Sequence, residues 1–263
     1  MTPDLIYDVG VNDGSDTAFY LSRGFRVVGI ECNPVMVEEL RGRFAREIAE
    51  GTLVLLNVGV ASDNGEMEFW VSDQHEWSSF DRSIASRNGT PHRAVTVRTR
   101  RFGEILAEQG VPFFCKIDIE GHDRLCLEGM TPETAPRYLS IEMNHRSGDS
   151  DIELLRALGY QRFKIISQAT LAQPIRSLTT LGYALPKRWG GLLQRMSRSL
   201  LGVPRLDGWE FKHGSSGAFA EDTPGPWHDA NWALERWKFL HDLDSRYAAK
   251  GLGDWFDVHA ARD

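Results

Sequence analysis

A short glycine-containing loop, Gly10–Gly14 (GVNDG), separates an apolar run from a helical pattern near the start of the chain. Its two glycines let the backbone turn sharply and let a ligand approach, while the following helix offers unpaired N–H groups. A nicotinamide dinucleotide site has a G-x-G-x-x-G loop, which places a pyrophosphate at that helix end. Here Asn12 stands at the second glycine position and the third glycine is missing. The loop therefore disfavours NAD.

Acidic residues surround this loop, namely Asp8, Asp13 and Asp16. Their charges would repel a pyrophosphate and attract a ligand that carries positive charge. S-adenosylmethionine carries an ammonium and a sulfonium group, and its carboxylate can use the helix amides. Glu31 ends the next apolar run, where a carboxylate can accept hydrogen bonds from both hydroxyls of a ribose. Glu31 suits NAD and S-adenosylmethionine equally, so only the composition of the Gly10–Gly14 loop distinguishes between these two cofactors.

The stretch KIDIEGHD, residues 116–123, is the second place where chemistry is expected. Asp118 and Glu120 are expected on one face of a strand end, where they meet the cofactor, a basic partner or a nearby cation. Alternatively, Lys116 or helix amides satisfy this pair. His122 follows on the first turn of a helix, and His145 follows the apolar run YLSIEM. The candidate catalytic residues are Asp118, Glu120, His122 and His145.

Alternating strand and helix patterns must position these residues. Strands are predicted at 5–9, 26–30, 53–60, 113–119, 138–143 and 159–166. Helices are predicted at 15–23, 34–48, 101–110, 121–130 and 152–158. The segments 66–71 and 94–100 predict an inserted hairpin with a mobile, serine-rich tip. This order favours a doubly wound, mostly parallel sheet with ligands at the carboxyl ends of its strands.

The second half of the chain contains a basic block. Residues 154–206 include no Asp or Glu but nine Lys and Arg, and LPKRWGGLLQRMSRSLL within it has amphipathic helical spacing. We expect residues 170–206 to be an inserted lid, a dimer contact or a surface-binding helix, against the alternative of a solvated basic face. A helix farther on is expected to pack through a stripe that consists of Ala233, Trp237, Leu240, Leu243 and Tyr247.

Composition sets limits on the class of protein. With 263 residues and 41% hydrophobic content, we expect a single domain over 1–263. The net charge of −7 argues against a nucleic-acid binder, and the three cysteines lack metal-site spacing. No leader pattern and no apolar run of about 18 residues is present. We expect a soluble, cytoplasmic protein, with a homodimer as one option.

The motifs DVGVNDGSDT, GIECNP, LNVGVAS, KIDIEGHD and IEMN occur in order between residue 4 and about residue 167. In this combination the chain resembles the FkbM-like family of S-adenosylmethionine-dependent methyltransferases. The resemblance implies a class I, Rossmann-like α/β fold with a seven-stranded sheet, to which the residue spacing adds a helical C-terminal tail. It also implies Glu31 on the ribose, Val60 and Ala61 near the adenine, and Asp118 near the methionine part. The cofactor-binding residues expected in all are Asp8, Gly10, Asn12, Asp13, Gly14, Thr17, Glu31, Cys32, Val60, Ala61 and Asp118.

The expected activity is O-methylation of a hydroxyl on a small molecule or glycan, since the family commonly acts on sugars, polyketide-type hydroxyls or small acids. A hydroxyl loses its proton as it attacks, so a general base is expected nearby. A carboxylate acceptor is the alternative, because it needs only a cationic clamp, which the basic block could supply. A non-catalytic cofactor-binding or membrane-surface module is a remote alternative. No metal is expected, since the spacing does not require one.

Overall fold

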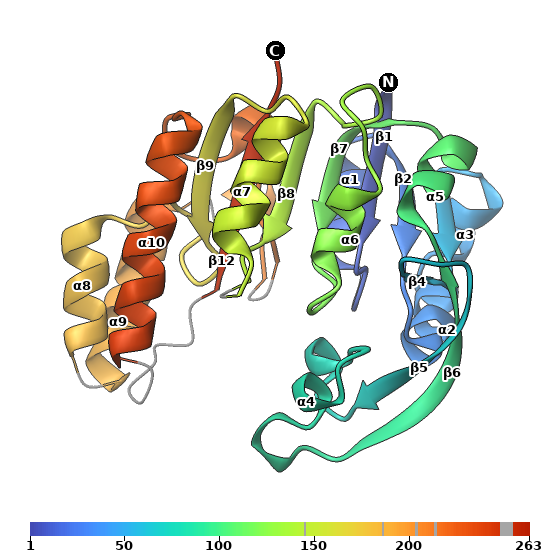
Figure 1. Ribbon diagram of the computed structural model, residues 1–263, viewed down its shortest axis with the longest axis horizontal. Helices are drawn as coiled ribbons and strands as arrows, with labels where there is room; N and C mark the ends of the chain where they lie inside the picture. The colour runs from blue at the N-terminus through green and yellow to red at the C-terminus, as the bar shows by residue number, and fades with distance from the viewer. Residues whose placement is uncertain (145, 186, 203–204, 213–214, 248–254) are drawn as a thin grey trace. The chain divides into compact units, whose positions relative to one another are not determined.

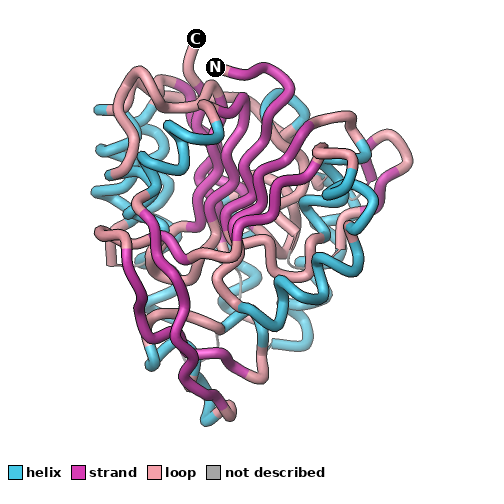
Figure 2. Tube along the Cα trace, turned by 90° about the vertical axis from the view of Figure 1, so that its right-hand side faces the viewer, coloured by secondary structure: helices cyan, strands magenta, loops and turns pink. Residues whose placement is uncertain are grey.

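Seven strands form the main sheet in the order β3-β2-β1-β7-β8-β12-β9 (Figure 1). They are β1 (Thr2–Val9), β2 (Arg26–Ile30), β3 (Leu53–Leu56), β7 (Pro112–Ile117), β8 (Tyr138–Glu142), β9 (Arg162–Ser167) and β12 (Phe256–Ala261). Helices lie on both sides of the strands (Figure 2). This computed structural model describes residues 1–144, 146–185, 187–202, 205–212, 215–247 and 255–263. The predicted α/β class, with a mostly parallel sheet of seven strands, is confirmed.

The chain divides into two compact units, Met1–Arg137 and Tyr138–Asp263. In the first unit, β1 pairs in parallel with β2 on one side and with β7 on the other, and β2 pairs with β3. The apolar residues Leu5, Ile6, Tyr7 and Val9 of β1 are buried, and so are Phe114, Cys115 and Ile117 of β7. The helices of this unit are α1 (Ser15–Ser22), α2 (Pro34–Arg43), α3 (Ala45–Ala49), α5 (Phe102–Gln109) and α6 (Asp123–Glu128).

Two predicted elements of the first unit are each divided in the structure. The single helix expected at 34–48 breaks at Phe44, whose φ and ψ are −110° and 27°. This break accompanies burial of the Phe44 ring against the Gly14 backbone. The strand expected at 53–60 ends at Leu56, where the Asn57 amide donates to the carbonyls of Glu31 and Cys32. The chain then leaves the main sheet and enters a second one.

The second sheet has three strands, β4 (Gly59–Val60), β5 (Gly65–Ser72) and β6 (His92–Arg100). Strands β5 and β6 pair antiparallel, which confirms the inserted hairpin, and Figure 1 labels both strands. The serine-rich tip between them forms short helices, η1 (His75–Trp77), α4 (Arg82–Ala85) and η2 (Arg87–Gly89). Figure 1 shows α4 beyond the carboxyl ends of β1 and β7.

The second unit is built on β8, β12 and β9, and β12 runs antiparallel to both neighbours. Its other elements are α7 (Gly148–Ala157), α8 (Arg176–Ala184), α9 (Lys187–Leu201), β10 (Arg205–Leu206), β11 (Trp209–Glu210), η3 (Ala220–Asp222) and α10 (Ala230–Tyr247). Ala233, Trp237, Leu240 and Leu243 of the α10 stripe are buried, as expected for packing, whereas Tyr247 is half-buried. No strand was predicted at β12. Its alternating Asp257 and His259 are both buried, so polar residues there conceal an interior strand.

Candidate cofactor and active site

The loop after β1 passes directly against the loop after β7. Gly10 has φ +88°, and a Cβ atom there would lie 1.8 Å from the carbonyl oxygen of Asp118. Gly14 has φ +75°, and its Cβ would lie 2.6 Å from the Phe44 ring. Asn12 also has a left-handed backbone, with φ 49°, a conformation that Asn tolerates better than most residues. The two glycines therefore set how closely the loop packs on its neighbours.

This close packing predicts different costs for two glycine substitutions. Gly10→Ala is expected to lower the free energy of unfolding by about 3 kcal/mol or more, since strain at positive φ adds to overpacking. Gly24 also has a positive φ, +82°, but no atom lies within 4 Å of its Cβ position. Gly24→Ala should therefore cost only about 1 kcal/mol. Urea unfolding measures both, and equal losses would contradict the close approach at Gly10.

The Glu31 side chain holds the loops after β1 and β2 together. Its Oε2 accepts from the Asn12 N–H at 2.9 Å and its Oε1 accepts from the Asn33 N–H at 2.7 Å. Burial raises the pKa of Glu31, although these two hydrogen bonds oppose the rise. Each carboxylate oxygen has two lone pairs, so each can accept one more hydrogen bond. The carboxylate thus lies at the carboxyl end of β2 with acceptor capacity left over.

A buried lysine lies among the acids of the first loop. Lys116 Nζ donates to the Gly10 carbonyl at 2.8 Å and is 3.2 Å from Asp8 Oδ1, 3.8 Å from Asp16 Oδ2 and 3.9 Å from Asp118 Oδ2. Burial opposes its charge, but these three carboxylates raise the pKa of Lys116 above its usual value. Sequence reasoning considered Lys116 only as a partner for Asp118 and Glu120. Its position among Asp8, Asp16 and Asp118 could have been predicted only if the pairing of β1 with β7 had been known.

The other acids of the first loop have local partners. Asp8 is fully buried and accepts from the Thr17 hydroxyl at 2.6 Å. Asp13 is exposed and accepts from both the backbone N–H and the hydroxyl of Ser15, each at 2.8 Å. The hydrogen bond between Asp8 and Thr17 therefore connects the end of β1 to α1 across the loop. Direct contact of either residue with a cofactor remains a prediction.

The prediction that Asp118 and Glu120 lie on a strand is wrong. Strand β7 ends at Ile117, and Glu120 has a left-handed backbone with φ 51°. Asp123 shapes this turn, because its carboxylate accepts from the Ile119 and Gly121 N–H groups at 2.8 and 2.9 Å. Asp118 and Glu120 nevertheless interact electrostatically, since the negative charge of Asp118 is one of the causes that raise the pKa of Glu120.

Burial raises the pKa of both acids. Burial raises the pKa of Asp118, while Lys116 opposes the rise. Burial, together with Asp118, raises the pKa of Glu120 to about 8, although Arg87 opposes it. A carboxyl group with a pKa near the working pH is suited to accept a proton in catalysis.

Two residues of the hairpin tip reach this turn, and sequence reasoning did not identify either. Arg87 Nη1 is 3.4 Å from Glu120 Oε2, and the Ser79 hydroxyl donates to the Glu120 carbonyl at 2.8 Å. The sequence showed that the tip is rich in serine, but it gave no sign that residues 79 and 87 contact residue 120. The insertion thus contributes directly to the Glu120 environment.

His122 lies beside the turn that follows β4. Its Nδ1 donates to the Val60 carbonyl at 3.1 Å, and its ring stacks on Phe80 with centroids 4.6 Å apart. In the neutral ring this leaves Nε2 as the acceptor nitrogen. Val60 and Ala61 are buried in this turn. Cys32 and Phe80 both pack against the apolar cluster of Phe69, Val71 and Val97, and burial raises the pKa of the Cys32 thiol.

One predicted catalytic residue, His145, lies outside the described residues. Nearby in the second unit, Glu142 ends β8, and the Asn144 side chain accepts from the Arg146 N–H at 2.9 Å. The remaining predicted site residues all belong to the first unit, at the ends of β1, β2, β4 and β7.

Comparisons with known proteins place these features in context. The chain is 27% identical over 184 residues to a protein named hexuronic acid methyltransferase AglP from Haloferax volcanii, and the match covers 66% of each chain. The chain therefore spans slightly less than two thirds of that relative. A solved structure, precorrin-6y C5,15-methyltransferase from Geobacter metallireducens, aligns over 100% of this chain and 82% of its own with 9% identity and a TM-score of 0.41. The family model described as the methyltransferase FkbM domain matches residues 8–162. The chain belongs to the FkbM methyltransferase family.

Proposed function

We propose that the protein transfers a methyl group from S-adenosylmethionine to a hydroxyl oxygen of a sugar or another small molecule. The observation that carries the proposal is the juxtaposition of Glu31, the Gly10–Gly14 loop and Glu120 at the carboxyl ends of adjacent parallel strands. This edge is where ligands bind in doubly wound folds. Membership of the FkbM family supports the same assignment.

The residues of the first unit fit this cofactor in charge and in hydrogen-bonding capacity. Glu31 keeps acceptor positions that suit the two hydroxyls of a ribose. Around Lys116 three carboxylates face one ammonium group, so the local charge stays negative and suits a cationic ligand. When bound, S-adenosylmethionine supplies an electrophilic methyl group. Asp8 and Thr17 serve in this proposal as positioning residues for the loop.

Glu120 is the general base in this proposal. A hydroxyl acceptor must lose a proton, and the Glu120 carboxylate, with a pKa near 8, accepts it. Arg87 keeps that pKa from rising further and so keeps the carboxylate ionised at a lower pH. His122 offers Nε2 as a second acceptor, because Nδ1 is committed to Val60.

The acceptor oxygen distinguishes this proposal from carboxyl methylation. A hexuronic acid carries both hydroxyls and a carboxylate, so the name of the relative suits either oxygen. The raised pKa of Glu120 favours a hydroxyl, because a carboxylate acceptor needs no base. The acid-free block at 154–206 is the feature that favours an anionic acceptor.

Calorimetry with S-adenosylmethionine, S-adenosylhomocysteine and NAD tests the choice of cofactor. We expect both sulfur compounds to bind and NAD not to bind. Binding of NAD without binding of either sulfur compound would refute the proposed function. A panel of uronic acids and their methyl esters then tests the acceptor, because a methyl ester retains the hydroxyls and lacks the free carboxylate.

Glu31→Gln should weaken S-adenosylmethionine binding by about tenfold or more, since hydrogen bonds to a charged group contribute about 1.5–3 kcal/mol each. The Gln NH2 group would also face one of the two backbone N–H groups, of Asn12 and Asn33, that now donate to Glu31. Glu38→Gln on the exposed face of α2 is the matched control. Equal dissociation constants for both variants, measured by calorimetry, would exclude Glu31 from the cofactor site.

A further inference from the structure

Helix α9 in the second unit has its apolar side exposed to solvent. Met196 is 52% exposed and Leu200 78% exposed, and Leu192, 41% exposed, precedes them at helical spacing. A shallow hollow of about 320 Å³ borders this stripe and is lined by Leu185, Trp189, Leu192, Leu193 and Met196. A helix of a globular protein normally turns its apolar side inward, so this orientation is inverted.

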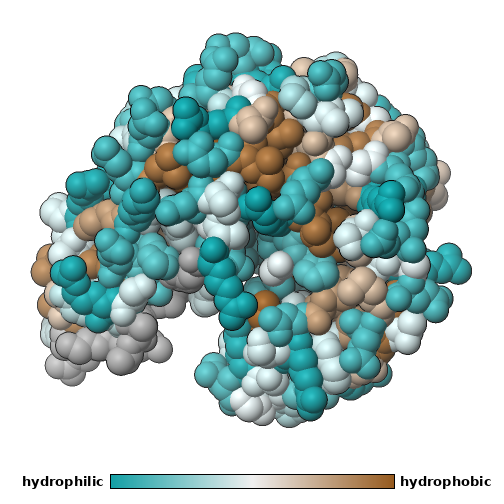
Figure 3. All heavy atoms as spheres, viewed as in Figure 1, coloured by the Kyte–Doolittle hydropathy of each residue, from teal (hydrophilic) through white to brown (hydrophobic). Residues whose placement is uncertain are grey.

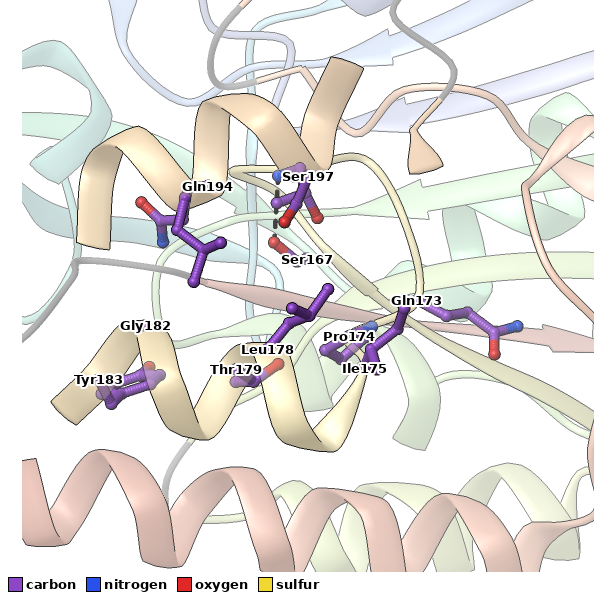
Figure 4. Close-up of a pocket in the computed structure, with 12 residues that line it drawn as sticks. Ser167, Gln173, Pro174, Ile175, Leu178, Thr179, Gly182, Tyr183, Gln194 and Ser197 are labelled. Carbon is purple, nitrogen blue, oxygen red and sulfur yellow. Dashed lines mark hydrogen bonds between the residues drawn. The ribbon is translucent and has the colours of Figure 1, made fainter. Parts of the chain in front are cut away.

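The other side of α9 faces α8 and is more polar. Gln194 and Ser197 lie on this side (Figure 4). Leu193 lines both the cavity on this side and the hollow beside the apolar stripe. The cavity between the helices has a volume of about 40 Å³. Ligand pockets measure about 300–1,000 Å³, so this cavity is too small for an acceptor. Packing on α8 therefore leaves the apolar stripe of α9 uncovered.

Apolar exposure continues on α8 and the residue before it. Leu181 is 48% exposed and Ile175 is 43% exposed. Figure 3 shows hydrophobic residues among hydrophilic ones at the left edge, over α8. On α9 itself, Leu192 and Met196 share one hollow with Leu185 and Trp189, so these exposed side chains are grouped rather than scattered.

The charges around this surface favour an anionic partner. Arg195 is exposed on α9 beside the apolar stripe, and no acidic residue occurs anywhere in 154–206. Two copies that meet through this surface would bring two acid-free basic segments together, which is electrostatically unfavourable. An apolar stripe flanked by basic residues is instead the pattern of helices that lie in the interface of a lipid bilayer.

We propose that α9 binds the surface of a bilayer that contains anionic phospholipid, with Leu192, Met196 and Leu200 inserted at the headgroup boundary and Arg195 near the lipid charges. The binding is interfacial, since no helix in the described part of the chain is long and apolar enough to cross a membrane. It is independent of the proposed methyl transfer, because α9 belongs to the second unit and the Glu31 and Glu120 sites belong to the first.

The test is vesicle co-sedimentation of the full chain with phosphatidylcholine alone and with phosphatidylcholine that contains phosphatidylglycerol. We expect at least about tenfold stronger partitioning onto the anionic vesicles, and a marked loss of binding at about 1 M salt, where charges are screened beyond about 3 Å.

Met196→Ser combined with Leu200→Ser should weaken partitioning about tenfold or more, since each substitution removes apolar area that would be buried in the bilayer. Arg195→Gln should weaken binding about fivefold, because each basic residue near an anionic surface contributes about 1 kcal/mol.

Matched controls come from the first unit, where Val54 is 37% exposed and Met67 is 40% exposed. Val54→Ser combined with Met67→Ser should leave partitioning unchanged, as should Arg98→Gln. Circular dichroism checks that each variant is folded. No binding to anionic vesicles, or unchanged binding by the α9 double variant, would overturn the proposal. So would light scattering that shows a dimer which the same α9 substitutions convert to a monomer, since a second copy would then cover this surface.

Discussion

Glu120→Gln is expected to lower kcat about 10²- to 10⁴-fold, the range that a positioned general base contributes. The amide keeps the size of the side chain but cannot accept the proton of a hydroxyl. The dissociation constant for S-adenosylmethionine should change by less than about twofold, because the role proposed for Glu120 is toward the acceptor. Glu66→Gln, on the exposed face of β5, is the control and should retain activity.

The pH dependence gives a second measurement for the same residue. The carboxylate form of Glu120 dominates above a pKa of about 8, so kcat/KM should rise as the pH increases through that value. Arg87 lowers this pKa, so Arg87→Gln should move the rise to higher pH, whereas Arg98→Gln should not move it. A flat pH profile in the native protein would exclude Glu120 as the base.

These experiments also separate the two acceptor chemistries. A carboxylate acceptor is already ionised at neutral pH, and Glu120→Gln would then leave kcat nearly unchanged. Calorimetry with S-adenosylmethionine would still report binding in that case. Failure of the base assignment is therefore distinguishable from failure of the cofactor assignment.

Local patterns predicted most of the first unit and the positions where its loops begin. Gly10 and Glu31 could be located because each follows a short apolar strand, a relation that spans few residues. The positive φ of Asn12 also fits a loop without a second glycine, since Asn adopts that conformation at low cost. Two features of the structure explain why Asn occupies position 12: its positive φ and the hydrogen bond that its N–H donates to Glu31. The absence of a pyrophosphate alone explains it less well.

Long-range contacts could not be predicted from those patterns. Arg87 approaches Glu120 from a hairpin tip, and the pairing of distant segments is set by topology rather than by local spacing. The interior strand β12 escaped prediction because Asp257 and His259 interrupt its apolar character. Burial lowers the pKa of His259 to about 3, which keeps the ring neutral inside the sheet. A polar residue that is neutral in the fold looks like a surface residue in the sequence.

Lys116→Met is expected to lower the free energy of unfolding by about 3–5 kcal/mol at pH 7, because removing one partner of a buried ion pair leaves its counter-charges uncompensated. Those counter-charges are the carboxylates of Asp8, Asp16 and Asp118, which lie 3.2, 3.8 and 3.9 Å from the lysine nitrogen. Lys238→Met on the exposed side of α10 is the matched control and should change stability by less than about 0.5 kcal/mol. Urea unfolding measures both variants.

The pH dependence of this loss follows from the pKa of Asp118. That pKa is already raised by burial, and loss of Lys116, which opposes the rise, would raise it further. A carboxyl group whose folded-state pKa is raised binds a proton more readily in the folded state, so lowering the pH through that pKa stabilises the fold of the variant relative to pH 7. The difference between native protein and variant should therefore shrink as the pH falls toward about 4, the ordinary pKa of Asp. Asp8→Asn combined with Lys116→Met should recover part of the stability, because Asn removes one unpaired charge and can still accept from Thr17. A loss that is independent of pH and is not relieved by Asp8→Asn would show that Lys116 stabilises the loop by packing and by its bond to the Gly10 carbonyl rather than by charge.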